Sequence, residues 1–246
     1  MKRILLPLLL FTSTSVVSFA QSGLLKKASG LLTKAKTGGT TSLSNDDIVA
    51  GLKEALSVGA QNSANKLSAV DGFFANAAIK VLMPPEAQKV EKTLRSVGMG
   101  KLVDDAILSM NRAAEQATKS AAPIFINAIK GMSINDALGI LKGSDTAATG
   151  YLRGKTSPAL TAAFRPVIDT ALHKTAATSY WKTVFDAYNK LPTTFTKINP
   201  DLAGYVTEKS LGGIFFQVAQ EEQKIRKDPA AQVTDILKKV FGGKSS

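Results

Sequence analysis

The chain has 246 residues, of which 44% are hydrophobic and 20% are charged, and its formal net charge is +12. This composition excludes an intrinsically disordered chain and allows a substantial core. The absence of cysteine excludes disulfides, thiol nucleophiles, thiolate metal sites and a lipoprotein-type anchor, and a lone histidine excludes a two-histidine metal motif. We therefore predict no metal, no cofactor and no catalytic residue of these kinds.

The first twenty residues have the order of a secretory signal peptide. Lys2 and Arg3 are followed by an apolar run at residues 4–11 and by small residues at Ser18 and Ala20. We expect cleavage after Ala20; a buried first helix and an uncleaved anchor are the alternatives, but the apolar run is short for a bilayer. We expect a soluble, periplasmic mature protein without a transmembrane span.

Three further parts follow the predicted signal peptide. Residues 21–43 are rich in Gly, Ser, Thr and Lys and read as a flexible basic leader, in which residues 24–35 have the spacing of a short amphipathic helix. Residues 44–242 read as the folded domain, which begins at Ser44 as a helix N-cap. Residues 243–246 read as a disordered tail.

Hydrophobic residues recur with the helical period from Ser44 onward, and no alternating strand pattern is present. We predict one all-α, bundle-like domain of about nine or ten helices. The clearest stripe is expected to face the core; it comprises Val103, Ala106, Ile107, Met110, Ala113, Ala114 and Ala117.

Four local predictions concern helix boundaries and faces. A helical segment is expected from about Phe73 to the double proline at 84–85, and Asp145 is expected to cap a helix. Ser157-Pro158 is expected to open a long helix, and the charged run at residues 221–227 is expected to face solvent.

One loop has the features of an anion site. Ser144, Asp145 and Thr146 precede a predicted helix, where backbone N–H groups are free, and Arg153 and Lys155 follow two turns later. These five residues are the candidate ligand-binding site. The alternative is an ordinary helix N-cap with solvated cations beside it.

Other motifs are assigned to structure or to chance. His173 lies four residues after Asp169, as in a surface helix pair. Two Ser-x-x-Lys tetrads, at residues 63–66 and 179–182, resemble those of penicillin-recognising enzymes, but the surrounding sequence lacks the strand that such a site needs. The aromatic residues near Trp181 fit a core better than a ligand cage.

Several stretches together are similar to one known family. They are residues 87–91 (Ala-Gln-Lys-Val-Glu), 108–115 (Leu-Ser-Met-Asn-Arg-Ala-Ala-Glu), 136–141 with 143 and 145–149, 199–202 (Asn-Pro-Asp-Leu) and 240–242 (Val-Phe-Gly). They resemble domain-of-unknown-function family 4197, over about residues 43–242. The resemblance implies an exported bacterial helical protein, and it implies no catalytic residues.

Three functional hypotheses follow. The first is a non-enzymatic periplasmic binding or scaffolding protein for a lipid-like ligand or a partner's helix. The second is an electrostatic adaptor whose basic surplus binds anionic envelope lipids, although a solvated basic surface explains the scattered charges better. The third is an enzyme with a site assembled from distant helices. No nucleic acid partner is expected, because the sparse aromatics offer no platform for stacking bases.

Overall fold

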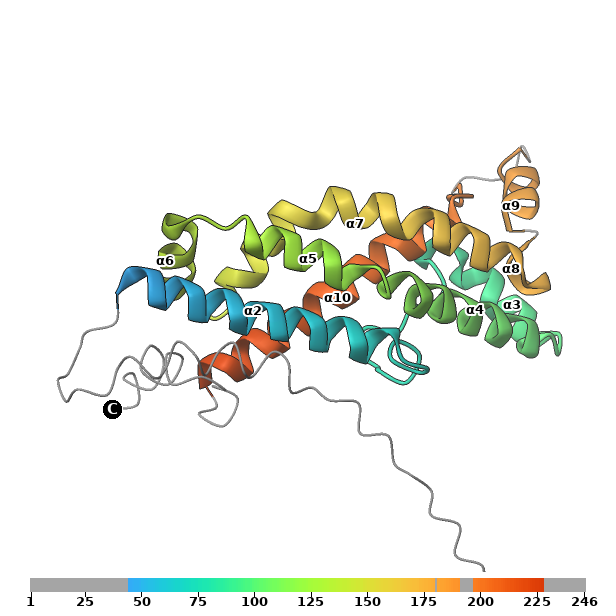
Figure 1. The fold of residues 1–246 in the computed structure, drawn as a ribbon. Coiled ribbons are helices and arrows are strands. Elements are labelled where there is room, and N and C mark those ends of the chain that lie inside the picture. Colours follow the sequence, from blue (N-terminus) through green and yellow to red (C-terminus); the bar gives the residue numbers. More distant parts are fainter. Residues whose placement is uncertain (1–43, 180, 191–196, 228–246) are drawn as a thin grey trace, which may run out of the picture. The chain divides into compact units, whose positions relative to one another are not determined.

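The computed structural model describes residues 44–179, 181–190 and 197–227, and over these residues the chain is all-α without a strand (Figure 1). The helices in chain order are α2 (Asn45–Ser68), the 3-10 turn η1 (Pro85–Ala87), α3 (Gln88–Ser96), α4 (Gly100–Thr118), α5 (Ala121–Lys130), α6 (Ile134–Lys142), α7 (Ala147–His173), α8 (Ala176–Ser179), α9 (Trp181–Asn189) and α10 (Leu202–Lys227).

Two helices begin with a capping box. The Ser44 hydroxyl accepts a hydrogen bond from the Asp47 N–H, and the Asp47 carboxylate accepts one from the Ser44 N–H, so the predicted N-cap of α2 is confirmed. Ser133 and Asp136 form the same reciprocal pair at the start of α6. The hydrogen bond from the Ser133 hydroxyl, and after it the one from the Ser133 N–H, lowers the pKa of the Asp136 carboxyl.

The core lies between α7, α10, α4 and α2, which pack against one another along their lengths. All seven residues of the predicted stripe on α4 are buried, which confirms that this face points inward. The largest fully buried side chains come from every one of these helices, from α5 and, in Phe73, from the turns after α2: Phe73, Phe125, Phe164, Phe215, Leu67, Met110, Ile129, Leu152, Leu160, Ile168 and Ile214. The described core is therefore filled by interlocking side chains.

Six helices build the bundle over the described residues, fewer than the nine or ten expected. They are α2, α3, α6, α7, α10 and a joined α4–α5, because residues 100–130 are helical except at a two-residue turn. The four-residue α8, which packs against α4 and α7, and α9, which contacts α8, are not counted among the six (Figure 1). The expected number was too high because it treated each proline or glycine signal as a helix boundary.

The helix expected from Phe73 to the double proline is absent, and residues 69–84 form turns and extended backbone. Buried polar side chains of α4 take over the hydrogen bonds that a helix would have made. The Glu115 carboxylate accepts the N–H groups of Phe73 and Phe74 at 3.2 and 3.3 Å. The Asn111 side chain binds both the N–H and the carbonyl of Val81, at 2.9 and 2.8 Å. Tertiary contacts thus override the local pattern.

The helix expected to open at Ser157-Pro158 instead begins ten residues earlier and runs through both Pro158 and Pro166. Each proline removes a backbone hydrogen bond and normally bends or ends a helix. Here both lie on the exposed face of α7, so the carbonyl groups that they leave without a partner, four residues earlier, can bind water.

Several predictions fall outside the described residues: the signal peptide, the leader helix at 24–35, the helix expected after residue 229 and the tail. Among the described helices, none is by itself both long enough and apolar enough to span a membrane.

Candidate functional site

The loop predicted to bind an anion begins α7, but its residues act within the protein. Asp145 does not cap the helix as expected: its carboxylate pairs with Lys227 at 2.9 Å, and Thr146 takes the N-cap position without a side-chain cap. The Ser144 carbonyl accepts the N–H of Ala147 in a turn.

The first turn of α7 does bind a carboxylate, and that carboxylate belongs to the same chain. Glu222 of α10 accepts the N–H of Ala148 at 3.0 Å, and the N–H and hydroxyl of Thr149 both at 2.8 Å. A helix N-terminus favours a negative charge at this position. Glu222 is 4% exposed, so the expectation that the whole run 221–227 faces solvent was wrong.

Arg226 completes this closed cluster. Its guanidinium donates to Glu222 at 2.8 and 3.0 Å and to the carbonyl of Ile140 at 2.8 Å, and its side chain is 9% exposed. A buried ion pair is tolerated only when its remaining hydrogen bonds are made as well, and here the partners supply them.

The two predicted cations do not join the loop residues in a common site. Arg153 lies over the Phe215 ring at 4.6 Å, and Lys155 lies 5.7 Å from the centre of the Tyr151 ring. Two of the N–H donors that an external anion would use are already bound to Glu222. Anion binding at this loop stays a prediction.

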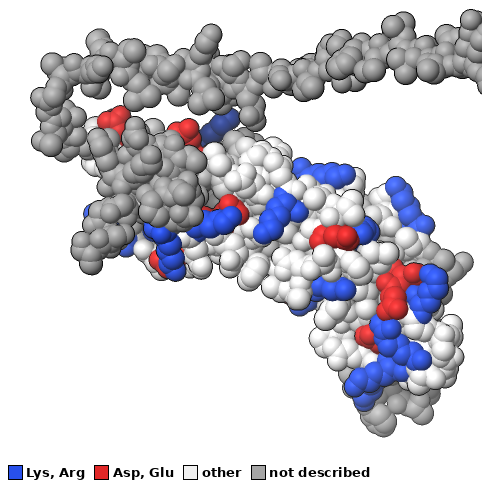
Figure 2. Space-filling view, turned by 90° about the horizontal axis from the view of Figure 1, so that it is seen from below, with Lys and Arg blue, Asp and Glu red and all other residues white. Residues whose placement is uncertain are grey.

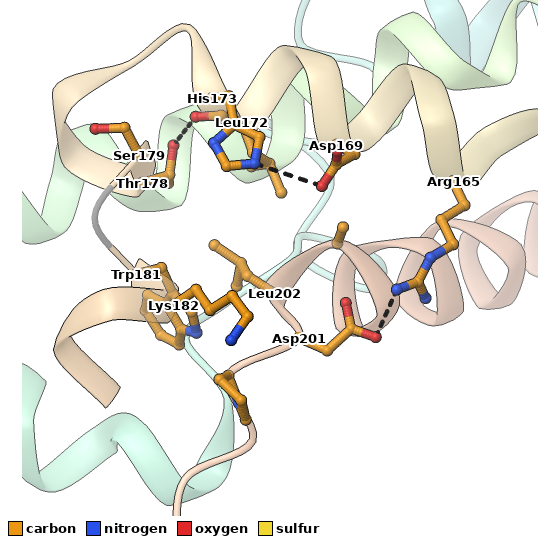
Figure 3. A pocket seen from close by; sticks show the side chains of 12 residues that line it. Arg165, Asp169, Leu172, His173, Thr178, Ser179, Trp181, Lys182, Asp201 and Leu202 are labelled. Atoms are coloured by element: carbon orange, nitrogen blue, oxygen red, sulfur yellow. Dashed lines mark hydrogen bonds and ion pairs between the residues drawn. The ribbon is translucent and has the colours of Figure 1, made fainter. Parts of the chain in front are cut away.

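A different site lies at the other end of α7. A cleft of about 300 Å³ opens between the end of α7, the turn into α8, the start of α9 and the start of α10 (Figure 3). Its lining combines charged and apolar groups: Arg165, Asp169, Leu172, His173, Thr178, Ser179, Trp181, Lys182, Pro200, Asp201, Leu202 and Ala203.

Trp181 supplies the unusual feature of this cleft. Its side chain is 7% exposed and packs against Phe185 with ring centres 4.5 Å apart, as the core interpretation predicted. Its indole N–H is buried, however, and has no hydrogen-bond partner. Such a donor has lost its water without replacement, which costs about 1–3 kcal/mol.

The charged groups of the cleft are paired loosely or at its edge. Arg165 donates to Asp201 at 2.8 Å, His173 lies 3.6 Å from Asp169, and Lys182 pairs with Asp186 on the same helix. All these side chains are substantially exposed. Solvent therefore weakens each pair.

Asp201 is the most firmly held carboxylate of the cleft. Its burial alone would raise the pKa, but hydrogen bonds from the Gly204 N–H and the Arg165 guanidinium outweigh that effect and lower it. The carboxylate is thus charged at neutral pH and fixes the start of α10 to α7.

Motifs that the sequence analysis set aside meet in this cleft. The pair Asp169–His173 and two residues of one Ser-x-x-Lys tetrad, Ser179 and Lys182, all line it. The signal that could have found the site is their order: the pair ends one helix, and the tetrad begins a few residues later. In Figure 3, however, the Ser179 side chain points away from His173 and Lys182.

No group of three or more metal-binding side chains comes together among the described residues. The predicted absence of a metal or cofactor stays a prediction.

Over the described residues the protein is all-helical, and it has a small, open cleft of charged and apolar side chains at one end of its bundle. Residues 42–242 match the family described as protein of unknown function, DUF4197, so the chain belongs to domain-of-unknown-function family 4197. No curated protein and no solved structure matches the chain.

Proposed function

We propose that this protein is a non-enzymatic ligand-binding protein of the bacterial cell envelope, and that the cleft beside Trp181 is its binding site. The observation that carries the proposal is the buried indole N–H without a partner. A ligand with a hydrogen-bond acceptor would satisfy it, and the exposed charged groups around it would orient that ligand. Envelope location rests on the signal-like first twenty residues.

Binding fits the cleft better than catalysis. A serine hydrolase needs its nucleophile within hydrogen-bond reach of a base, whereas Ser179 points away from both candidate bases (Figure 3). His173 and Asp169 are both exposed, and their contact of 3.6 Å is too long for a firm hydrogen bond. The pair is open to water rather than shielded for chemistry.

A lipid-like ligand or a partner's helix would use a second surface. A groove of about 510 Å³ runs between residues 78–88 and one face of α10, and it leaves Leu82 56% and Phe216 40% exposed. Lipid in the centre of the bundle is disfavoured, since the described core is filled by fully buried side chains. The groove supports the scaffolding alternative.

Pull-down of a helical partner tests that alternative. Leu82→Ser combined with Phe216→Ser should abolish capture, whereas Val58→Ser, at another exposed apolar position, should not. Equal capture by both variants would contradict a role for the groove.

An electrostatic adaptor draws less support from the described domain. Its residues include 22 Lys and Arg against 17 Asp and Glu, so much of the basic surplus lies in the leader and beyond residue 227. On the face in Figure 2, basic and acidic side chains alternate rather than gather. Such a surface gives a weak, salt-sensitive attraction to anionic membranes.

The binding proposal is tested with two matched variants. His173→Phe replaces the polar imidazole in the cleft with a larger, apolar ring, while Lys174→Phe places the same ring one residue later, outside the lining. Protein purified from its host should carry a small molecule detectable by mass spectrometry, or shift its melting temperature with members of a polar-metabolite library. His173→Phe should lose both signals and Lys174→Phe should keep them. Identical signals in both variants, or none in the native protein, would overturn the proposal.

A further inference from the structure

The cleft has two chemically different ends, and this difference points to the class of its ligand. Trp181 and Lys182 lie together on one side (Figure 3). Asp169 lies on the other side, on α7, with the apolar side chains of Leu172 and Leu202 between the two ends.

The end formed by Trp181 and Lys182 offers donors. An indole N–H can only donate a hydrogen bond, and this one has no partner. The Lys182 ammonium pairs with Asp186 one turn along the same helix, but its side chain is exposed and can reorient at small cost. Because the indole nitrogen is shielded from solvent, a ligand reaches it only if a neighbouring side chain moves aside. A carboxylate is an acceptor that both groups can bind at once.

The end formed by Asp169 offers an acceptor. Its contact with His173 is 3.6 Å long, so its oxygens keep capacity for another donor. Asp201, the other carboxylate of the cleft, differs: one oxygen accepts the Gly204 N–H and the other accepts Arg165. An ammonium group of a ligand would therefore be bound by Asp169 rather than by Asp201.

We propose, building on the binding function above, that the cleft binds a small zwitterion with a free ammonium and a free carboxylate. The carboxylate binds Trp181 and Lys182, the ammonium binds Asp169, and an aliphatic part covers Leu172 and Leu202. A volume of about 300 Å³ lies at the lower limit for small-molecule pockets. It suits a dipeptide, in which the ammonium and the carboxylate are several bonds apart, better than a free amino acid, in which both groups are on one carbon.

The experiment compares four probes on the full chain by titration calorimetry and by the fluorescence of Trp181, the only tryptophan. They are L-leucine, the dipeptide Leu-Leu, N-acetyl-leucine and leucine amide. The first two carry both charges, which are on one carbon in leucine and several bonds apart in the dipeptide; the third lacks the ammonium and the fourth lacks the carboxylate. At least one zwitterion should bind, and each singly charged probe should bind about tenfold or more weakly.

Two variants test which end of the cleft binds which charge of the ligand, and a third variant is the control. Asp169→Asn should weaken the bound zwitterion about tenfold and leave N-acetyl-leucine unchanged, while Lys182→Gln should leave leucine amide unchanged. Asp105→Asn is the matched control, because it removes an exposed carboxylate from a similar helical pair that is not part of the cleft lining. It should change nothing.

Failure of this inference is distinct from failure of the binding function. If N-acetyl-leucine or leucine amide binds as tightly as the zwitterions, the ligand class is wrong and the cleft is still a binding site. The same conclusion follows if no probe binds but His173→Phe removes a ligand found in the host or library. If no probe binds and His173→Phe changes nothing, both proposals are wrong.

Discussion

The two ends of α7 use polar groups in opposite ways. At its N-terminal end, the Glu222 carboxylate is buried and receives hydrogen bonds from Ala148, Thr149 and Arg226. At its C-terminal end, charged side chains are exposed and loosely paired, and the buried N–H of Trp181 has no partner. Both ends contact α10, which runs antiparallel to α7.

The polar groups at the N-terminal end of α7 stabilise the fold, whereas those at its C-terminal end are available to a ligand. A fully satisfied buried cluster has no capacity left for an external molecule, and breaking it leaves an uncompensated charge. An exposed, partly satisfied cluster contributes little to stability and can exchange its partners. The four predictions below test this contrast.

The largest change in stability is expected at the N-terminal end of α7, where Glu222 is buried. Glu222→Gln removes the charge that compensates the buried Arg226, and it should lower the free energy of unfolding by about 3–5 kcal/mol. Urea denaturation followed by circular dichroism measures it. Glu208→Gln, an exposed position on the same helix, is the control and should change stability by less than about 0.5 kcal/mol. Equal effects would contradict the assignment of Glu222 as a structural anchor.

A second closed cluster should behave like the first. Asn111→Ala leaves the N–H and carbonyl of Val81 buried without partners, so a loss of about 2 kcal/mol is expected. Amide hydrogen exchange should also show faster exchange at Val81 than in the native chain. If Val81 stays protected, Asn111 does not hold this segment.

At the C-terminal end of α7, the loss of a polar group should change the stability little. Trp181→Phe removes a donor that has no partner, which offsets the smaller buried area of the new ring. The net change in unfolding free energy should stay within about 1 kcal/mol in either direction, measured by circular dichroism because no tryptophan remains. A loss of unfolding free energy as large as that of Glu222→Gln would show that polar groups stabilise both ends of α7 alike.

The smallest effect concerns pH. Because the folded-state pKa of Asp201 is lowered, its carboxylate adds stability above the ordinary pKa of Asp, and this is lost as pH falls through the lowered value. Asp201→Asn should therefore be slightly less stable than the native chain at pH 7. The difference should shrink once the pH is lowered below 3.8, the ordinary pKa of Asp. Urea midpoints at the two pH values measure it, and a difference that persists in acid would contradict the sign.

Local chemistry in the sequence was enough to predict that the domain is helical and that Ser44 caps its first helix. The stripe on α4 is buried as expected, because both features depend on residues within one or two turns.

Two expectations were wrong because of a partner far away in the chain. Residues 69–84 lose their expected helix to Glu115 and Asn111, and Glu222 of the charged run is buried against the first turn of α7. Neither partner can be recognised from local spacing, since a Glu in a charged run normally faces solvent.

The cleft could be predicted only in its parts. Asp169 with His173 and Ser179 with Lys182 were each visible as a spacing, but no local pattern places them around one space. The unpaired N–H of Trp181 was invisible, because an aromatic in a hydrophobic stripe gives no sign of whether its nitrogen finds a partner.

The anchor at Glu222 also affects the order in which the chain can fold. The carboxylate that completes the start of α7 lies 73 residues further along the chain. During synthesis, α7 therefore emerges well before the residue that neutralises its first turn, and bringing the two together closes a long loop. The bundle reaches its final form only after almost the whole domain has been made.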